Sequence, residues 1–297
     1  MPNKVGFVGL GTMGKWMALN LLKKQKPLWV YDLQPEVVEE LQGQGARAAS
    51  SILDLGEKCD VIILCLPDAK VVDEALFGRT SLKPSLRAGM TIIDCSTTDA
   101  SFARDIEKKL RKRGVTFLDA PISGMASKVR EGRLTIMVGG DRVAFEKVRP
   151  LLAAMGNTIA YLGGPGNGQL TKTLNNVLFN ISCAAMAEIL PLAVKMGIAP
   201  EEFCKVIASS SGQSYGFDFF APLVLKRDFG PGYSMNNAYK DMANLNKLTA
   251  QQQIPLPVAA ATMQTYQMAL ASGHGQENKG AMVKVWEAMH GVVVKKS

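Results

Sequence analysis

The sequence is poor in the residues on which several common kinds of site depend. It has only two histidines among 297 residues, His274 and His290, and both lie near the C-terminus. Five cysteines are scattered through mainly apolar segments, without a CxxC pair or a Cys/His spacing that would bind zinc. We therefore expect no metal site and no histidine acid/base, and we expect buried, reduced thiols in a cytoplasmic protein.

Long apolar runs and dense blocks of charge are also missing. No apolar stretch approaches the roughly 20 residues of a membrane span, and the first residues lead into a strand without the layout of a signal peptide. The net charge is +8, but its lysines and arginines are dispersed, and the densest run, residues 107–114, has the spacing of a solvated helix face. We expect neither a membrane nor a nucleic acid as partner, and the basic charge favours small anionic ligands.

Two patterns divide the chain. Over residues 1–164, short apolar, β-rich segments alternate with helical patterns, which predicts parallel βαβ units and a sheet covered on both faces. Over residues 165–297 helical periodicity dominates, and a long apolar helix extends to about Lys195. The predicted architecture is an α/β, doubly wound sheet followed by an all-α domain, with the long helix joining them.

A glycine motif follows the first predicted strand. Gly9, Gly11 and Gly14 have GxGxxG spacing, and an amphipathic helix comes after them, as a Rossmann-type dinucleotide site requires. The first glycine permits a tight turn, the second lets the backbone approach a pyrophosphate, and the third allows close packing of helix and strand. Thr12 and Met13 belong to the same candidate cofactor site, at the helix N-terminus that would bind the pyrophosphate. A purely structural βα turn is the alternative.

Asp32 ends the second predicted strand. This is the usual place of the acid that binds the adenosine ribose hydroxyls, and a 2′-phosphate would be repelled there. The neighbouring residues offer no arginine for such a phosphate, so we expect NAD and consider NADP the less favoured cofactor. A helix N-cap is the alternative role for this carboxylate.

The segment FVGLGTMGKWMALNLL resembles the N-terminal signature of the 3-hydroxyisobutyrate dehydrogenase, or β-hydroxyacid dehydrogenase, family. Met13, Met17, Ala18 and Asn20 match in addition to the glycines. Three further segments match in order: LDAPISG with EGRLTIMVGG, then GNGQLTKTLNN, then YKDMANL. The resemblance covers nearly the whole chain and implies NAD(P)-linked oxidation of an alcohol, or its reverse, by a homodimer or homotetramer. The C-terminal half is most similar to the 2-(hydroxymethyl)glutarate dehydrogenases.

By this resemblance, Lys172 is the catalytic acid/base. The chemistry agrees, because hydride transfer to a carbonyl builds negative charge on oxygen and needs a proton donor. Asn175 and Asn176 share the helical face of this lysine, where an amide can hold the substrate or orient the ammonium. Gly168, one turn earlier, is expected to leave room for a ligand. The alternative is a lysine that extends from a helix start into solvent.

The resemblance assigns roles to six more residues. Ser123 and Gly124 are expected to hold the substrate carboxylate, although an ordinary Ser-Gly turn is the alternative. The other four are expected to contact the cofactor, Thr97 near its nicotinamide: Leu66, Pro67, Thr97 and Lys240. The alternatives are strand ends for the first two and a surface ion pair for the last.

The substrate loop departs from the family pattern. Met125 replaces a glycine, and Lys128, Arg130 and Arg133 bring three positive charges into or just beyond the loop. These charges predict a second anionic or strongly polar group on the substrate, unless all three face solvent. The substrate therefore stays open between a small 3-hydroxy acid and a sulfonated or other anionic aldehyde. A non-catalytic binding domain, or imine reduction, is disfavoured because such relatives lose the lysine that Lys172 matches.

Overall fold

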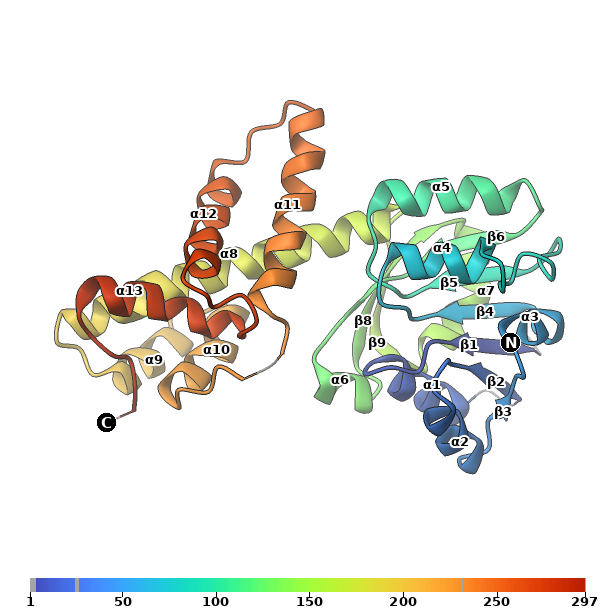
Figure 1. Cartoon of the computed structure of the whole chain (residues 1–297), viewed down its shortest axis with the longest axis horizontal. Coiled ribbons are helices and arrows are strands. Elements are labelled where there is room, and N and C mark those ends of the chain that lie inside the picture. Colours follow the sequence, from blue (N-terminus) through green and yellow to red (C-terminus); the bar gives the residue numbers. More distant parts are fainter. Residues whose placement is uncertain (1–3, 25–26, 231, 297) are drawn as a thin grey trace. The chain divides into compact units, whose positions relative to one another are not determined.

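The computed structural model describes residues 4–24, 27–230 and 232–296 (Figure 1). The chain forms two compact units, Met1–Lys172 and Thr173–Ser297. Their boundary lies within one continuous helix, α8 (Asn167–Lys195), whereas the sequence analysis divided the chain between residues 164 and 165. The predicted fold class, a Rossmann-type sheet followed by an all-helical domain that starts with a long helix, is confirmed.

Among the described residues, the first unit is built on a nine-stranded sheet with the order β3-β2-β1-β4-β5-β6-β8-β7, in which β9 also pairs with β8. The strands are β1 (Val5–Val8), β2 (Leu28–Tyr31), β3 (Arg47–Ala48), β4 (Val61–Leu64), β5 (Thr91–Asp94), β6 (Thr116–Asp119), β7 (Ile122–Ser123), β8 (Leu134–Gly140) and β9 (Gly156–Tyr161). The pairings from β3 to β6 are parallel, as predicted. However, β8 runs antiparallel to β6 and β7, so the sheet is mixed at this end.

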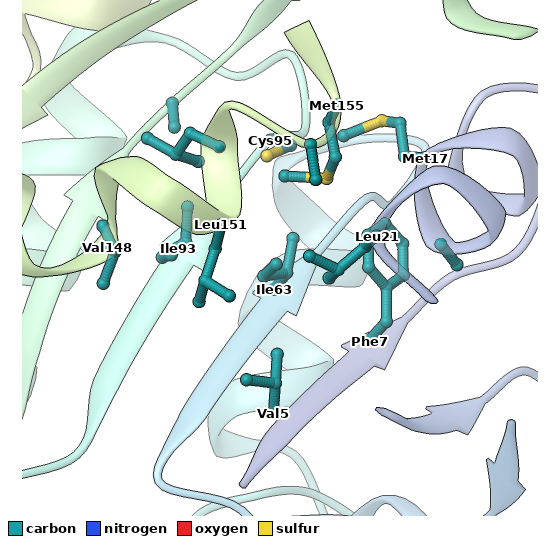
Figure 2. Packing of buried hydrophobic residues seen from close by; sticks show 14 of the residues in the cluster. Val5, Phe7, Met17, Leu21, Ile63, Ile93, Cys95, Val148, Leu151 and Met155 are labelled. Atoms are coloured by element: carbon teal, nitrogen blue, oxygen red, sulfur yellow. The ribbon is translucent and has the colours of Figure 1, made fainter. Parts of the chain in front are cut away.

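Helices cover both faces of this sheet: α1 (Gly14–Leu22), α2 (Pro35–Gly43), α3 (Ile52–Lys58), α4 (Ala69–Phe77), α5 (Ala100–Arg111), α6 (Ala126–Arg130) and α7 (Arg142–Leu152). Strand residues alternate between two apolar clusters, because successive side chains point to opposite faces. Ile63 packs in one cluster and Ile62 in the other. Figure 2 shows Leu21 of α1 and Leu151 of α7 on the same face as Ile63.

The second unit contains the rest of α8 and the helices that follow it. These are α9 (Pro200–Ala208), α10 (Tyr215–Leu225), α11 (Met235–Gln251), α12 (Pro257–Ala271), a 3₁₀ turn η1 (Lys279–Met282) and α13 (Val283–His290). They surround a separate core, in which Tyr266 is fully buried. The unit therefore has the packed interior of an independent domain.

Helix α8 corrects one expectation from the sequence. The helix has 29 residues, and its most apolar 18-residue window has a mean hydropathy of 1.9. By length and composition alone it could therefore cross a membrane. Half of that window is buried within the protein, which is also common in the core helices of soluble proteins. The expectation that no segment meets this criterion was wrong, while the absence of a membrane partner stays a prediction.

All five cysteines are free. Cys59, Cys95 and Cys183 are buried, as expected, whereas Cys65 and Cys204 are half-buried. Burial raises the pKa of each thiol, to about 12 for Cys59, Cys65 and Cys183 and to about 11 for Cys204. These side chains pack as small apolar groups.

Candidate functional site

The glycine-rich turn between β1 and α1 has the geometry that its spacing predicts. Gly9 has a φ of +91°, and a Cβ there would lie 2.3 Å from the carbonyl oxygen of Cys65. A Cβ on Gly14 would lie 1.9 Å from the carbonyl oxygen of Gly9. Helix α1 can therefore pack this closely against the glycine turn only because residue 14 has no side chain. A Cβ on Gly11 would meet nothing within 4 Å, which leaves the exposed side of the turn open. These features fit a dinucleotide whose pyrophosphate lies against the start of α1.

Asp32 follows β2 and is joined to that turn. One carboxylate oxygen accepts a hydrogen bond from the backbone N–H of Leu10, and the other accepts from the backbone N–H of Gln34 at 2.9 Å. Gln34, not Asp32, is the N-cap of α2. Each carboxylate oxygen has a second lone pair, so the group can also accept from ribose hydroxyls.

Three of the predicted cofactor contacts lie at the carboxyl ends of adjacent strands. Leu66 and Pro67 follow β4, and Thr97 follows β5, which pairs in parallel with β4. The two loops are bonded together, because the backbone N–H of Leu66 donates to the hydroxyl of Ser96 at 2.9 Å. The carboxyl edge of the parallel strands is where ligands bind in folds of this kind.

The predicted substrate loop begins at β7. Ser123 ends that strand and pairs with Thr135 of β8. Gly124 has a φ of +151°, and a Cβ there would lie 2.7 Å from the side chain of Leu134 and 3.4 Å from the Cβ of Lys128. The loop therefore needs glycine at this position, and the stem of Lys128 runs alongside it.

The three cations after the loop have different surroundings. The guanidinium of Arg130 lies 4.7 Å from the ring centre of Trp16, on α1. Arg133 forms an ion pair with Glu131. The side chain of Lys128 lies next to Gly124.

Lys172 is half-buried in α8 and is the last residue of the first unit. The start of its helix is attached to the end of β6 by Asp119, which is buried. The Asp119 carboxylate accepts from the backbone N–H groups of Gly166 at 2.8 Å and Gln169 at 2.9 Å. Burial raises the pKa of Asp119, although these hydrogen bonds oppose the shift.

Gly168 has a different role from the one expected. A Cβ there would lie 2.4 Å from the carbonyl oxygen of Met137 and 2.7 Å from that of Asp119. The missing side chain therefore allows α8 to contact the sheet, and it does not leave space for a ligand.

Two buried residues of this region were not singled out from the sequence. Gln169 bonds to the loop after β5, at the backbone N–H of Thr98 and the carbonyl of Ser96. Asp94, at the end of β5, accepts from the backbone N–H of Ser96 at 3.0 Å, while its other oxygen has no hydrogen-bond partner among the described residues. Burial raises the pKa of Asp94 to about 7. The sequence signal that could have identified Asp94 and Asp119 is an aspartate at the end of an apolar strand, in TIID and TFLD respectively.

The remaining candidates belong to the second unit. Asn175 is exposed and Asn176 is buried, both on the turn of α8 after Lys172. The amide of Asn176 donates to a carboxylate oxygen of Asp241 at 2.9 Å, and Tyr233 donates to the same oxygen. Lys240 is exposed on α11.

Comparison with known proteins shows the family of each half of the chain. Residues 4–163 match the family described as the NAD binding domain of 6-phosphogluconate dehydrogenase. Residues 166–286 match the family described as the NAD-binding region of NADP-dependent 3-hydroxyisobutyrate dehydrogenase.

Individual relatives match over nearly the whole chain. The 2-(hydroxymethyl)glutarate dehydrogenase of Eubacterium barkeri is 35% identical over 98% of this chain and 97% of its own length. Human mitochondrial 3-hydroxyisobutyrate dehydrogenase is 34% identical over 92% of this chain and 84% of its own. The structure of 3-hydroxyisobutyrate dehydrogenase from Mycobacterium tuberculosis, solved with L-serine, superimposes with a TM-score of 0.85 at 27% identity, over 96% of this chain and 99% of that one. The chain therefore belongs to the 3-hydroxyisobutyrate dehydrogenase, or β-hydroxyacid dehydrogenase, family of NAD(P)-dependent oxidoreductases.

Proposed function

We propose that this protein is an NAD-dependent dehydrogenase that interconverts a small 3-hydroxy acid and its semialdehyde or oxo acid, with Lys172 as the acid/base. The observation that carries the proposal is the attachment of the first turn of α8 to the sheet through Asp119. This attachment brings the start of the helix that bears the lysine to the carboxyl edge, where the family binds its ligands.

A bound nicotinamide supplies the hydride acceptor for oxidation, or the hydride donor for reduction. During oxidation the substrate carbon loses a hydride, and the proton of its hydroxyl passes to the neutral amine of Lys172. During reduction the ammonium of Lys172 returns that proton to the developing alkoxide. Ser123 and the backbone of Gly124 hold the substrate carboxylate, and the amides of Asn175 and Asn176 hold the substrate or orient the lysine.

The cofactor side of the proposal uses the first unit. The turn Gly9–Gly14, including Gly11, Thr12 and Met13, takes the pyrophosphate. Asp32 takes the ribose hydroxyls and selects NAD, while Leu66, Pro67 and Thr97 line the cofactor. We propose that Lys240 reaches the cofactor or the active site from the helical unit.

The substrate we propose carries a second anionic group, as the substrate named for the Eubacterium barkeri relative does. The support is the stem of Lys128, whose Cβ lies 3.4 Å from the position that a Cβ on Gly124 would take, so that this side chain runs beside the substrate loop. An anionic aldehyde, such as a sulfonated one, is the second candidate, because the same lysine would attract it. We also propose that the enzyme works in the cytoplasm as a homo-oligomer.

The test measures NAD reduction by the purified protein with a panel of 3-hydroxy acids that includes dicarboxylic and sulfonated members. NADH oxidation is measured with the matching aldehydes. In Lys172→Ala, kcat should fall by roughly 10²–10⁴-fold, the usual contribution of general acid/base catalysis. NADH binding, measured by fluorescence titration, should be unchanged, because the lysine acts on the substrate oxygen. A variant that keeps more than about a tenth of the wild-type kcat would contradict the acid/base role.

A further inference from the structure

One buried carboxamide connects the helix of Lys172 to the loop of Thr97. Gln169 lies in the first turn of α8, three residues before Lys172, and is fully buried. Its Oε1 accepts from the backbone N–H of Thr98 at 3.0 Å, and its Nε2 donates to the carbonyl of Ser96 at 2.8 Å. The two bonds hold the backbone on either side of Thr97, whose own side chain is exposed.

Both partners of this connection are anchored elsewhere in the first unit. The helix start is held by Asp119, which accepts from the backbone N–H of Gln169 itself. The loop is held by Ser96, whose hydroxyl accepts from Leu66 and whose backbone N–H donates to Asp94. Helix and loop are therefore each attached to a strand end, and the Gln169 side chain joins them directly.

We propose that Gln169 is a positioning residue, whose carboxamide sets the placement of Thr97 relative to Lys172. The inference rests on the proposed acid/base role of Lys172. In the proposed reaction Thr97 contacts the cofactor near its nicotinamide and Lys172 acts on the substrate oxygen, so the separation of these two residues has to be fixed. A misplacement of about 1 Å can cost about 10²-fold in rate even when binding persists. Gln169 therefore affects the rate of the chemical step more than the binding of either ligand.

Two substitutions of similar size separate this role from simple loss of stability. Gln169→Met removes both hydrogen bonds, and kcat should fall by about 10–100-fold while KM for the hydroxy acid and for NAD changes less than about threefold. Gln169→Glu retains both bonds when its carboxyl is protonated and loses the donor to Ser96 when it ionises. The ratio of its kcat to the wild-type kcat should therefore approach one at low pH and fall as pH rises, and Gln169→Met should show no such rescue.

A second measurement requires no turnover. Hydrogen exchange of the ligand-free protein should be faster at the amide of Thr98 in Gln169→Met than in wild type, because that N–H loses its acceptor. Asn278→Leu is the matched control, since it removes another buried carboxamide that bonds to the backbone, at Asp228, Gly230 and Gly280 in the helical unit. The control should lower Tm and leave kcat and the exchange of Thr98 unchanged.

Three results would overturn the positioning role. The first is faster exchange at Thr98 in Gln169→Met with kcat within about twofold of wild type. The second is a fall in kcat without faster exchange. The third is a loss of kcat in Gln169→Glu that does not depend on pH. Activity that survives in Lys172→Ala would instead contradict the acid/base assignment, and the exchange experiment would still report whether Gln169 holds the loop.

Discussion

The two units differ in how much apolar surface they expose. Among the described residues, two large hydrophobic side chains of the first unit are exposed, Leu33 and Val143, against fifteen in the second. Several of those fifteen form one face of α8 and its C-terminal extension: Leu174, Leu178, Ile189, Leu192 and Met196. Successive members are 4, 11, 3 and 4 residues apart, close to whole numbers of helical turns, which brings them to the same side of the helix.

This contrast indicates a division of tasks. The sheet unit covers its own apolar residues, and its buried polar groups hold the loops at the carboxyl edge. Among its described residues, the helical unit leaves a long apolar face of α8 uncovered by its own helices, which is typical of a surface that binds another subunit. We therefore expect the helical unit to carry assembly and the sheet unit to carry cofactor selection.

The largest expected effect is on assembly. Replacing both Leu178 and Ile189 by glutamate should dissociate the proposed homo-oligomer and raise its dissociation constant about 10³-fold, because two side chains that the interface would bury, worth roughly 1.5–3 kcal/mol each, are replaced by charges. Light scattering after size exclusion measures the mass. Val143→Glu is the matched control, since Val143 is 63% exposed and Leu178 is 70% exposed, and it should leave the mass unchanged. A wild-type monomer that binds lipid vesicles through this face would refute the division of tasks.

The preference for NAD or NADP should depend only on residues of the first unit. We expect kcat/KM to favour NAD over NADP by at least about 10-fold, since a charge-assisted hydrogen bond contributes roughly 1.5–3 kcal/mol. Asp32→Ser combined with Leu33→Arg should shift the ratio toward NADP by about 100-fold, and Leu33 is 85% exposed, so the arginine has room. The oligomer mass should not change. Equal efficiency of wild type with both cofactors would remove Asp32 as the selector.

Neutralising a buried acid should have opposite effects on protein stability in the two units: the change at Asp94 should stabilise, and the change at Glu287 should destabilise. The pKa of Asp94 is raised from 3.8 to about 7, so the folded protein keeps a proton between these values that the unfolded chain releases. Stability therefore falls as pH rises through this window, by about 1.4 kcal/mol per pH unit at its steepest.

Asp94→Asn removes this penalty. Its stability relative to wild type should rise by about 2 kcal/mol between pH 5 and pH 8, measured by urea unfolding. Glu287 of the helical unit instead pairs with Arg227 and accepts from the backbone N–H of Val294, so Glu287→Gln should destabilise the protein at both pH values. A gain for Asp94→Asn that is the same at pH 5 and pH 8 would show that its proton is not involved.

The smallest expected effect concerns substrate choice. Lys128→Ala should raise KM several-fold for a hydroxy acid with two anionic groups and leave KM for a singly charged one unchanged, since an exposed charge contributes roughly 1 kcal/mol. Arg133→Ala is the control, because that guanidinium pairs with Glu131. An equal change for both substrates, or none, would exclude Lys128 from recognition of the second anion and favour Met125, which replaces a glycine in the same loop, as the residue that sets specificity.

Local patterns were sufficient for much of the fold and for part of the site. The βαβ alternation, the glycine turn and the helix that ends near Lys195 could be read because each depends on neighbouring residues. The antiparallel β8 was missed, since its apolar pattern is the same in either direction. The links made by Asp119 and Gln169 were missed because they join residues 47 to 73 positions apart. Gly168 was misinterpreted for the same reason, as the atoms that exclude a side chain belong to β6 and β8.

The raised pKa values of the native cysteines have a practical consequence for spectroscopy. A thiol with a pKa of about 11–12 is ionised to only about one part in 10³–10⁴ at pH 8, and the thiolate is the form that reacts with maleimides and iodoacetamides. A cysteine introduced at an exposed position such as Val143 would therefore be labelled far faster than the five native ones. Fluorophores or spin labels could then be attached to the intact sequence background, without first replacing residues that the core uses as packing.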